Sequence, residues 1–494
     1  MKKTARILAL VLALMMIVTC FIACGGKEDD PNVVSTTTVA NNGGEGDAST
    51  TRDIYESHLT PTDWGGKAWN VLGRDSNQMT NYEIDADSLN GNVVNDAVFT
   101  RNEQIKTQYG IDVVGTIVSN PTSTADLLYS GGEDLYHAVL YIPRDMIKHA
   151  QRGFFLDLNT VENIDLAHGA WDWQANEELS INGKLYIANS DFLIQAKART
   201  YFMMYNRELF HTHEEYVDVF IEDFVESGDW TLEKFYEISS SGFASDLDGG
   251  GAGGKNDQWV LCADGSNVTR NFAFGAGYRV CKNNDGILEL VPVDDKTVSM
   301  VSEIMKVTRE ATMTLEPGMF QPLDYALGID TFADGRSLFL SDLPSSFDLS
   351  LGSSIDFEYG ILPYPKYDKE QPAYYTQFNY ENGSCVGIPY TVSDVPFAGY
   401  ALEAVTEAST KTSLEAFIET KCKLHHSYDQ KCADMLDILY DNVVYDVGAM
   451  LNVGGAYSVI ADVITYYPGN PLSRLYEKKV DAANTAIEEV NNNW

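Results

Sequence analysis

With 494 residues, 44% of them hydrophobic and 11% aromatic, the chain is too long for a single compact core, so we expect two or more lobes. Its 72 acidic and 34 basic residues give a formal net charge of -38. A surface this acidic repels nucleic acid and anionic lipid headgroups, so we expect no nucleic-acid partner.

The N-terminus has the pattern of an export signal. A short basic segment is followed by an apolar run from Ile7 to Ala23 and then by Cys24. This order predicts a lipoprotein signal peptide over residues 1–23, with Cys24 lipidated as the mature N-terminus. Phe21 stands where such signals usually carry Leu. The alternative is an uncleaved anchor, for which the run is near the lower length limit; either way, the remainder lies outside the membrane.

Residues 24–58 are rich in Gly, Asp, Ser, Thr and Asn and poor in apolar residues. A segment of this composition cannot bury enough apolar surface to fold, so we expect a disordered tether. Such a tether would let a lipid-anchored folded part reach a partner on the same membrane.

Strands and helices alternate in the next part of the chain. The predicted strands are 68–73, 111–118 and 136–142, and the predicted helices are 93–109, 123–129 and 146–151. This alternation predicts an α/β lobe with a largely parallel sheet. Ligands of such sheets bind beyond the carboxyl ends of the strands, which makes Asp75 and Asn77 candidate ligand-binding residues. The turn 142–145 is a second candidate, and an ordinary solvated loop remains the alternative for both turns.

The later chain carries further helices and three short buried strands. A helix begins after Thr231, and the other predicted helices are 298–310, 396–408, 413–421, 431–440 and 476–490. A strand is expected over 258–263. The apolar runs 337–340, 359–362 and 385–388 predict strands that return to complete the sheet begun near the N-terminus.

Those three strands carry a family resemblance. The motifs are T-F-A-D-G-R-S-L-F-L (331–340), Y-G-I-L-P-Y-P-K-Y (359–367) and C-V-G-I-P-Y (385–390). In this order they resemble the substrate-binding lipoproteins of ABC importers, in the extracellular solute-binding family 1 that includes the maltose-binding protein. The three motifs are similar to those of a clostridial-type subgroup of that family. Thr200–Phe210 resembles the "Y-N-K-x-L" element that opens the second lobe, with Arg207 in place of the usual Lys.

The resemblance implies an α/β, periplasmic-binding-protein-like type II fold, in which a multi-stranded hinge joins two α/β lobes and the ligand cleft lies between them. It implies lobe 1 over 59–200 plus 328–388, and lobe 2 over 201–327 plus 389–494. The implied function is a monomeric extracellular binding protein held at the cell membrane by its lipid. It would capture a carbohydrate, most simply an oligosaccharide, by hinge closure and deliver it to an ABC permease.

Sugars present apolar C–H faces and rings of hydroxyls, which aromatic rings and polar side chains recognise. The residues that the resemblance turns toward a sugar are Trp171, Trp173, Asp191, Trp259, Asp342, Asn379 and Tyr380. For each of these residues taken singly, a role in the core or on the surface is an equally good interpretation.

We expect no enzyme, no cofactor and no metal ion. The sequence contains no G-x-S-x-G, H-E-x-x-H, Walker or C-x-x-C motif. The loop with Asp246, Asp248 and Asp257 resembles the start of a calcium loop but lacks its middle acid, which favours a metal-free glycine-rich turn. The five cysteines after Cys24 are odd in number and scattered, which favours buried free thiols.

Three alternatives stay open. The same fold could serve as a receptor for a peptide or another small solute. The abundant carboxylates also allow a secreted carbohydrate-active enzyme. A purely structural surface lipoprotein is the remaining alternative.

Overall fold

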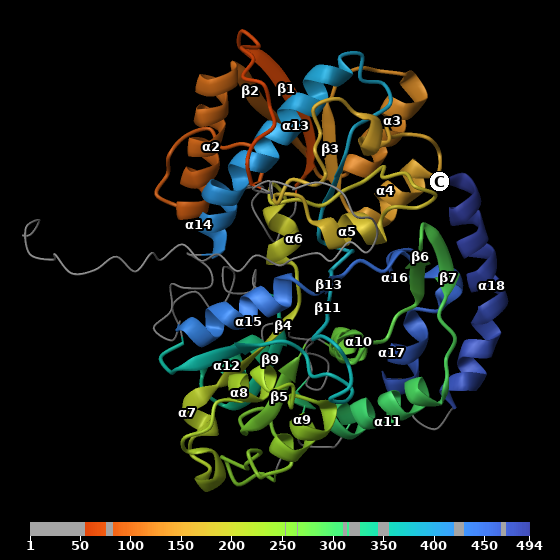
Figure 1. Ribbon diagram of the computed structural model, residues 1–494. Helices are drawn as coiled ribbons and strands as arrows, with labels where there is room; N and C mark the ends of the chain where they lie inside the picture. Colours follow the sequence, from red (N-terminus) through yellow and green to blue (C-terminus); the bar gives the residue numbers. More distant parts are fainter. Residues whose placement is uncertain are drawn as a thin grey trace, which may run out of the picture. The chain divides into compact units, whose positions relative to one another are not determined.

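The computed structural model describes residues 55–75, 83–251, 253–263, 265–309, 314–315, 327–343, 355–418, 429–465 and 471–494 (Figure 1). The predicted signal peptide, Cys24, Asn77 and the end of the predicted helix 413–421 lie outside these residues. By its internal contacts, Asp53–Trp494 forms one compact unit, and it is the unit described below. Among the described residues, no helix has both the length and the hydropathy needed to cross a bilayer.

The first sheet contains four strands in the order β12-β3-β1-β2. β1 (Lys67–Arg74) pairs in parallel with both β2 (Ile111–Val118) and β3 (Ala138–Tyr141), and β12 (Cys385–Gly387) joins β3 in the antiparallel direction. Every residue of β3 and β12 is buried, as expected for central or covered strands built from short apolar runs. The predicted α/β lobe with a largely parallel sheet is therefore confirmed.

Helices complete the first lobe. α2 (Val93–Tyr109) is capped by the Asn92 side chain, and its C-cap Gly110 has a φ of 63°, a left-handed conformation that suits glycine. α13 (Val395–Ser409) packs beside α2, where Figure 1 shows the two helices next to each other. The bounds of the other helices of this lobe are α3 (Pro121–Gly131), α4 (Pro143–Ala150) and α14 (Glu415–Phe417).

The second sheet is mixed, with the order β10-β4-β9-β5-β8. β4 (Phe202–Asn206) is antiparallel to both β9 (Ser337–Asp342) and β10 (Tyr359–Leu362). β5 (Trp259–Ala263) is parallel to β9 and to β8 (Thr314–Leu315). The structure thus has two α/β lobes, each built on one sheet.

The sequence prediction placed three returning strands in the first sheet, and the structure corrects two of them. Only β12 returns there, with Val386 opposite Leu140. β9 and β10 flank β4 in the second sheet, where Met204 lies opposite both Leu340 and Ile361. A short apolar run indicates a buried strand, but it carries no information about which sheet buries it. The expected division at residue 389 is also crossed, because α13 packs against the first lobe.

An aromatic cluster lies beneath the second sheet. The rings of Phe235 and Phe339 are 4.9 Å apart, and Trp230 lies 5.6 Å from Phe235. Thr231 caps α9 (Leu232–Ser239) through a bond from Lys234 N, as predicted. The other helices of this lobe are α7 (Arg207–Phe210), α8 (Ile221–Glu226), α10 (Gly265–Gly275), α11 (Asp295–Arg309), α12 (Leu327–Ala333) and α15 (Gln430–Tyr440).

Small elements complete the chain. They are α5 (Trp173–Glu178), α6 (Ile194–Ala198), the hairpin β6 (Cys281–Asn284) and β7 (Ile287–Leu290), the pair β11 (Thr376–Gln377) and β13 (Val443–Val444), α16 (Val447–Leu451), α17 (Ser458–Thr465) and α18 (Leu472–Asn493). The last residue, Trp494, donates its indole N–H to Lys184 O at 3.0 Å, which ties the end of α18 to the first half of the chain.

The described cysteines are Cys262, Cys281, Cys385 and Cys432, and all four are free and buried. Burial raises the pKa of Cys432 to about 11 and that of Cys262 to about 12, so these thiols stay protonated and inert at neutral pH. The expectation of buried free thiols is confirmed for these four.

Candidate functional site

The carboxyl ends of strands from both sheets meet at one place, which we call the inter-sheet junction and define by Arg74, Arg199, Asp342 and Glu381. β1 ends at Arg74, and β9 ends at Asp342. Arg74 Nη1 donates to Glu381 O at 3.2 Å, and Arg199 is close enough to Arg74 and Asp342 for their charges to act on it. Because ligands of α/β sheets bind beyond the carboxyl ends of the strands, this junction is the candidate site.

Arg199 occupies the centre of the charges at the inter-sheet junction. It follows α6 as its C-cap and is only 2% exposed. Burial lowers the pKa of Arg199; Arg74 adds to this effect, whereas Tyr201 and Asp342 oppose it. An arginine held in a buried position offers a rigid fork of donors, which suits directional hydrogen bonds to hydroxyl or carboxylate oxygens.

Tyr380 and Tyr457 form an aromatic pair beside the junction. Their ring centres are 5.2 Å apart at an interplanar angle of 71°. The guanidinium carbon of Arg270 lies 4.8 Å from the ring centre of Tyr457, and Gln377 Nε2 donates to the Tyr457 hydroxyl at 2.8 Å. Burial raises the pKa of Tyr380 well above its ordinary value, so its hydroxyl stays protonated at neutral pH. The group therefore combines aromatic rings that are 5% and 7% exposed with neutral hydrogen-bonding atoms.

Asn379 holds the turn that carries Tyr380. Its side-chain oxygen accepts from the backbone N–H groups of Glu381 and Asn382, both at 3.2 Å. Its Nδ2 donates to the Tyr201 hydroxyl at 3.2 Å. These bonds fix the backbone whose carbonyl receives Arg74, so Asn379 acts as a positioning residue of the junction.

Trp173 begins α5 and is 62% exposed. Asp172 caps this helix by accepting from Ala175 N at 3.0 Å, and its other oxygen accepts from the Tyr445 hydroxyl at 3.1 Å. Tyr445 follows β13, so these bonds attach α5 to the late part of the chain. The exposed indole is therefore held on a fixed helix and is available for stacking.

Asp191 points into the protein. Its Oδ2 accepts from Thr410 Oγ1 at 2.7 Å, at the end of α13. Burial raises the pKa of Asp191, and the nearby Lys197 opposes that effect. In this structure the carboxylate fixes α13 and does not reach the inter-sheet junction.

The remaining predicted site residues differ in burial and in position relative to the junction. Trp171 is 3% exposed and Trp259 is 1% exposed. Trp259 is the first residue of β5, which puts it at the amino end of the strand, opposite the junction. Asp75 is exposed and follows Arg74 directly, while Asn77 lies outside the described residues. The structure thus brings Asp75, Asp342, Asn379 and Tyr380 to or beside the junction.

The sequence prediction missed Arg199, Tyr201, Arg270 and Tyr457. Tyr201 is the first residue of the predicted lobe 2, and Arg199 lies two residues before it. A chain that crosses between lobes must pass the site, so polar and aromatic residues at such a crossing are candidates. Arg270 and Tyr457 have no comparable signal, because each follows from packing between α10 and α17, which are distant in sequence.

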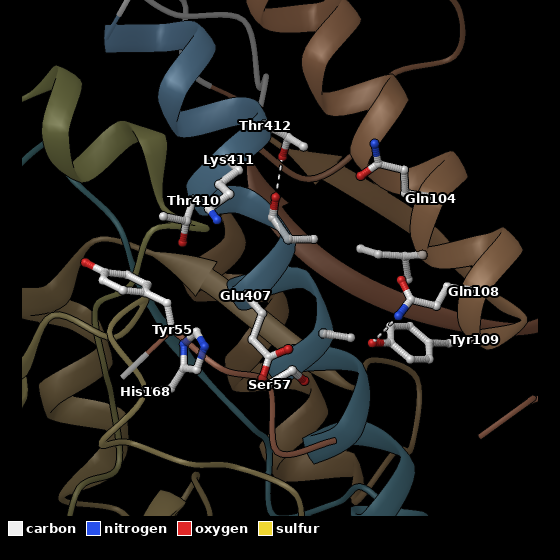
Figure 2. Close-up of a pocket in the computed structure, with 13 residues that line it drawn as sticks. Tyr55, Ser57, Gln104, Gln108, Tyr109, His168, Glu407, Thr410, Lys411 and Thr412 are labelled. Carbon is white, nitrogen blue, oxygen red and sulfur yellow. Dashed lines mark hydrogen bonds between the residues drawn. The ribbon is translucent and has the colours of Figure 1, made fainter. Parts of the chain in front are cut away.

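A separate cavity of about 400 Å³ lies away from the inter-sheet junction (Figure 2). It opens between α2 and α13, with Gln104 and Gln108 on one side and Thr410 and Lys411 on the other. Tyr55 and Ser57, from the end of the predicted tether, close one wall. The last residues of that tether therefore contact the first lobe, contrary to the expectation of disorder up to residue 58.

The acidic loop has the geometry of a turn closed by backbone donors. Asp246, Asp248 and Asp257 offer oxygens within 4.8 Å of one another. Asp246 Oδ1 accepts from Gly249 N at 2.7 Å, and Asp257 Oδ2 accepts from Gly254 N at 2.6 Å. The bond from Gly254 is the main reason why the pKa of Asp257 is lowered. These bonds suit the glycine-rich turn that the sequence favours.

No protein-family model and no curated protein matches the chain. Solved structures do match. The ABC substrate-binding protein Lmo0181 from Listeria monocytogenes, in complex with cycloalternan, has a TM-score of 0.53 at 12% identity, over 85% of this chain and 99% of its own. A cyclo/maltodextrin-binding protein complexed with maltotetraose has a TM-score of 0.56 at 15% identity, over 86% and 99%.

A third match is the maltose/maltodextrin-binding domain MalE from Bdellovibrio bacteriovorus bound to maltotriose. Its TM-score is 0.52 at 14% identity, over 85% of this chain and all of that one. These three structures are binding proteins that carry a sugar. At such identities the likeness shows the fold alone: the chain has the two-lobed α/β fold of the periplasmic binding proteins.

Proposed function

We propose that this protein is the extracellular substrate-binding lipoprotein of an ABC importer. It captures an oligosaccharide between its two lobes, closes around it by hinge motion and delivers it to the permease. The lipid on Cys24 anchors it to the cell membrane, and the tether gives it reach. It performs no chemistry on the sugar.

The observation that carries the proposal is the inter-sheet junction. There the carboxyl ends of β1 and β9 bring together two arginines and an aspartate from both lobes. The aromatic pair Tyr380 and Tyr457 lies beside them, but both rings are buried, at 5% and 7% exposure, so the exposed Trp173 is the ring available to stack on a sugar. The bound sugars of the three similar structures support the same class of ligand.

The test is calorimetry and thermal denaturation of Gly25–Trp494 with maltotetraose, a cyclodextrin, amino acids and short peptides. A sugar at 100 times its Kd should raise the free energy of unfolding by about 2.7 kcal/mol, and it should be recovered intact. Arg74→Ala and Asp342→Asn should each weaken binding at least tenfold, because each removes a charged group at the junction.

Arg152→Ala is the matched control. Arg152 pairs with Asp126 on the surface and follows the last turn of α4, a helix that starts at the carboxyl end of β3 and runs away from it. Its loss should leave sugar affinity unchanged. Binding of peptides alone would contradict the assignment of a sugar as the ligand. Cleavage of the sugar would contradict the transport role. Equal effects of all three variants on affinity would contradict the assignment of the inter-sheet junction as the binding site.

A further inference from the structure

His58 faces three carboxylates. Its Nδ1 lies 3.8 Å from one oxygen of each; the oxygens are Asp165 Oδ2, Glu403 Oε1 and Glu407 Oε1. Its Nε2 lies 3.1 Å from Asn163 O. A carbonyl oxygen only accepts, so Nε2 carries a proton, and in the neutral ring Nδ1 presents its lone pair to the carboxylates. Four atoms with lone pairs therefore converge on one space.

Two of these oxygens are buried without a partner. Neither Glu403 Oε1 nor Glu407 Oε1 accepts a hydrogen bond from any residue that the structure describes. Glu403 is fully buried, and its other oxygen accepts from Trp171 Nε1 at 2.9 Å and from Asp165 N at 3.2 Å. These two bonds fix the carboxylate and direct Oε1 toward His58.

The electrostatics of Glu403 agree with this geometry. Its pKa is raised to about 8, mainly by burial; the two hydrogen bonds lower it, and the negative charges of Glu407 and Asp165 raise it. This is the behaviour of a carboxylate that lacks a positive partner. A cation among these groups would supply the missing charge and satisfy the orphaned oxygens.

A first-row divalent cation fits the donor set and the spacing. The ligand atoms of His58, Glu403 and Glu407 all lie within 4.8 Å of one another. Tetrahedral Zn²⁺ with bonds of about 2.0–2.1 Å separates its ligands by about 3.4 Å, so the 3.8 Å separations between His58 Nδ1 and the two glutamate oxygens need to shorten by about 0.4 Å. One imidazole with carboxylates and no thiolate suits Zn²⁺ or Mn²⁺ better than Ca²⁺, which takes oxygen ligands.

We propose that His58, Glu403 and Glu407, with Asp165, form a binding site for a divalent transition-metal cation, with Zn²⁺ the preferred ion. Glu403 and Glu407 lie one turn apart on α13, whereas His58 lies at the end of the predicted tether. The ion thus links the first residues that the structure describes to α13. This role is independent of sugar binding.

The site is open to solvent on one side. His58 has a side-chain exposure of 31%, and Glu407 also lines the cavity of Figure 2, where it lies beside Ser57. A hydrated ion can therefore reach the ligands without unfolding of the lobe.

The experiment uses Gly25–Trp494, stripped with a chelator and titrated by calorimetry with ZnCl₂, MnCl₂ and CaCl₂. We expect one Zn²⁺ per chain, with Ca²⁺ at least tenfold weaker. His58→Ala and Glu407→Gln should each reduce Zn²⁺ affinity tenfold or more. Bound Co²⁺ should give visible absorption bands that His58→Ala removes. Circular dichroism of each metal-free variant checks that it folds.

His211→Ala is the matched control. His211 Nε2 also lies 3.0 Å from a backbone carbonyl, that of Val219, and it makes no ion pair with a described carboxylate. Its loss should leave metal binding unchanged. The proposal is overturned if none of the three metals binds stoichiometrically, or if binding survives His58→Ala and Glu407→Gln. NMR that shows a proton on His58 Nδ1 at neutral pH, without metal binding, would assign the space to that proton and overturn the proposal too.

Discussion

Trp171 donates its indole N–H to Glu403 Oε2 at 2.9 Å, across 232 positions of sequence. Both side chains are buried, at 3% and 0% exposure. The indole therefore connects a loop of the first lobe to α13 and has no free face for a sugar. Trp173, two residues later, is 62% exposed. We expect one tryptophan to contribute to stability and the other to ligand binding.

Trp171→Phe should destabilise the protein and leave sugar affinity unchanged. The ring still fills most of the space, but a buried carboxylate oxygen loses a donor, which costs about 1–3 kcal/mol. Urea denaturation measures the loss, and calorimetry with the sugar identified by the screen measures the affinity. A stable variant that binds sugar more weakly would contradict this assignment.

Trp173→Ala should have the opposite effect. A mostly exposed side chain at the first turn of a helix contributes little to folding, so the free energy of unfolding should change by less than about 0.5 kcal/mol. Loss of a stacking surface should weaken sugar binding several-fold. Unchanged sugar affinity would remove Trp173 from the binding residues, and Trp171→Phe serves as the paired comparison.

The first sheet could be predicted because its strands are marked locally. The run Ile111–Val118, for example, follows Gly110, whose left-handed conformation ends α2. β9 and β10 have equally clear apolar runs, yet their partner is β4, which lies far away in sequence. The choice of partner depends on cross-strand packing that no local pattern contains.

The same distinction applies to the site. Asp75 follows a predicted strand, so the rule for carboxyl ends finds it, whereas Asp342 is indicated by the family resemblance. Trp259 carried the same aromatic signal as Trp173, but it lies at the amino end of β5 and is buried. Residue type alone cannot separate these two cases. Arg270 reaches Tyr457 only through the packing of α10 on α17.

Glu83 should make stability depend on pH. It is 3% exposed, its Oε2 accepts from Gln195 N at 2.9 Å, and burial raises its pKa from 4.5 to about 7. The folded state therefore binds this proton more tightly than the unfolded state. Between pH 4.5 and 7 the folded protein holds more protons, so this contribution falls as pH rises.

Glu83→Gln isolates the effect, because other titrating groups cancel when the two proteins are compared. The wild type should lose on the order of 2–3 kcal/mol relative to the variant between about pH 5 and about pH 8. Urea denaturation at several pH values gives both profiles. Parallel profiles would show that Glu83 titrates near its ordinary pKa.

Arg207 and Glu222 form a buried ion pair in the second lobe. Arg207 Nη2 lies 2.5 Å from Glu222 Oε1, and Nη1 lies 2.7 Å from Asp429 Oδ2. Glu222 is 0% exposed and also accepts from the Tyr205 hydroxyl. A planar fork serves the two carboxylates from separate nitrogens, whereas the usual Lys of the resembling motif presents its three donors from a single atom.

Arg207→Ala should therefore cost about 3–5 kcal/mol, because it leaves the Glu222 charge buried and unpaired. Arg207→Lys should cost less, since one ammonium still reaches one carboxylate. The double variant Arg207→Met with Glu222→Met should be more stable than Arg207→Ala, because no buried charge remains. Lys106→Ala, which breaks an exposed pair with Asp112, should leave the urea midpoint unchanged. A double variant no more stable than Arg207→Ala would show that packing around the guanidinium, and not its charge, stabilises this lobe.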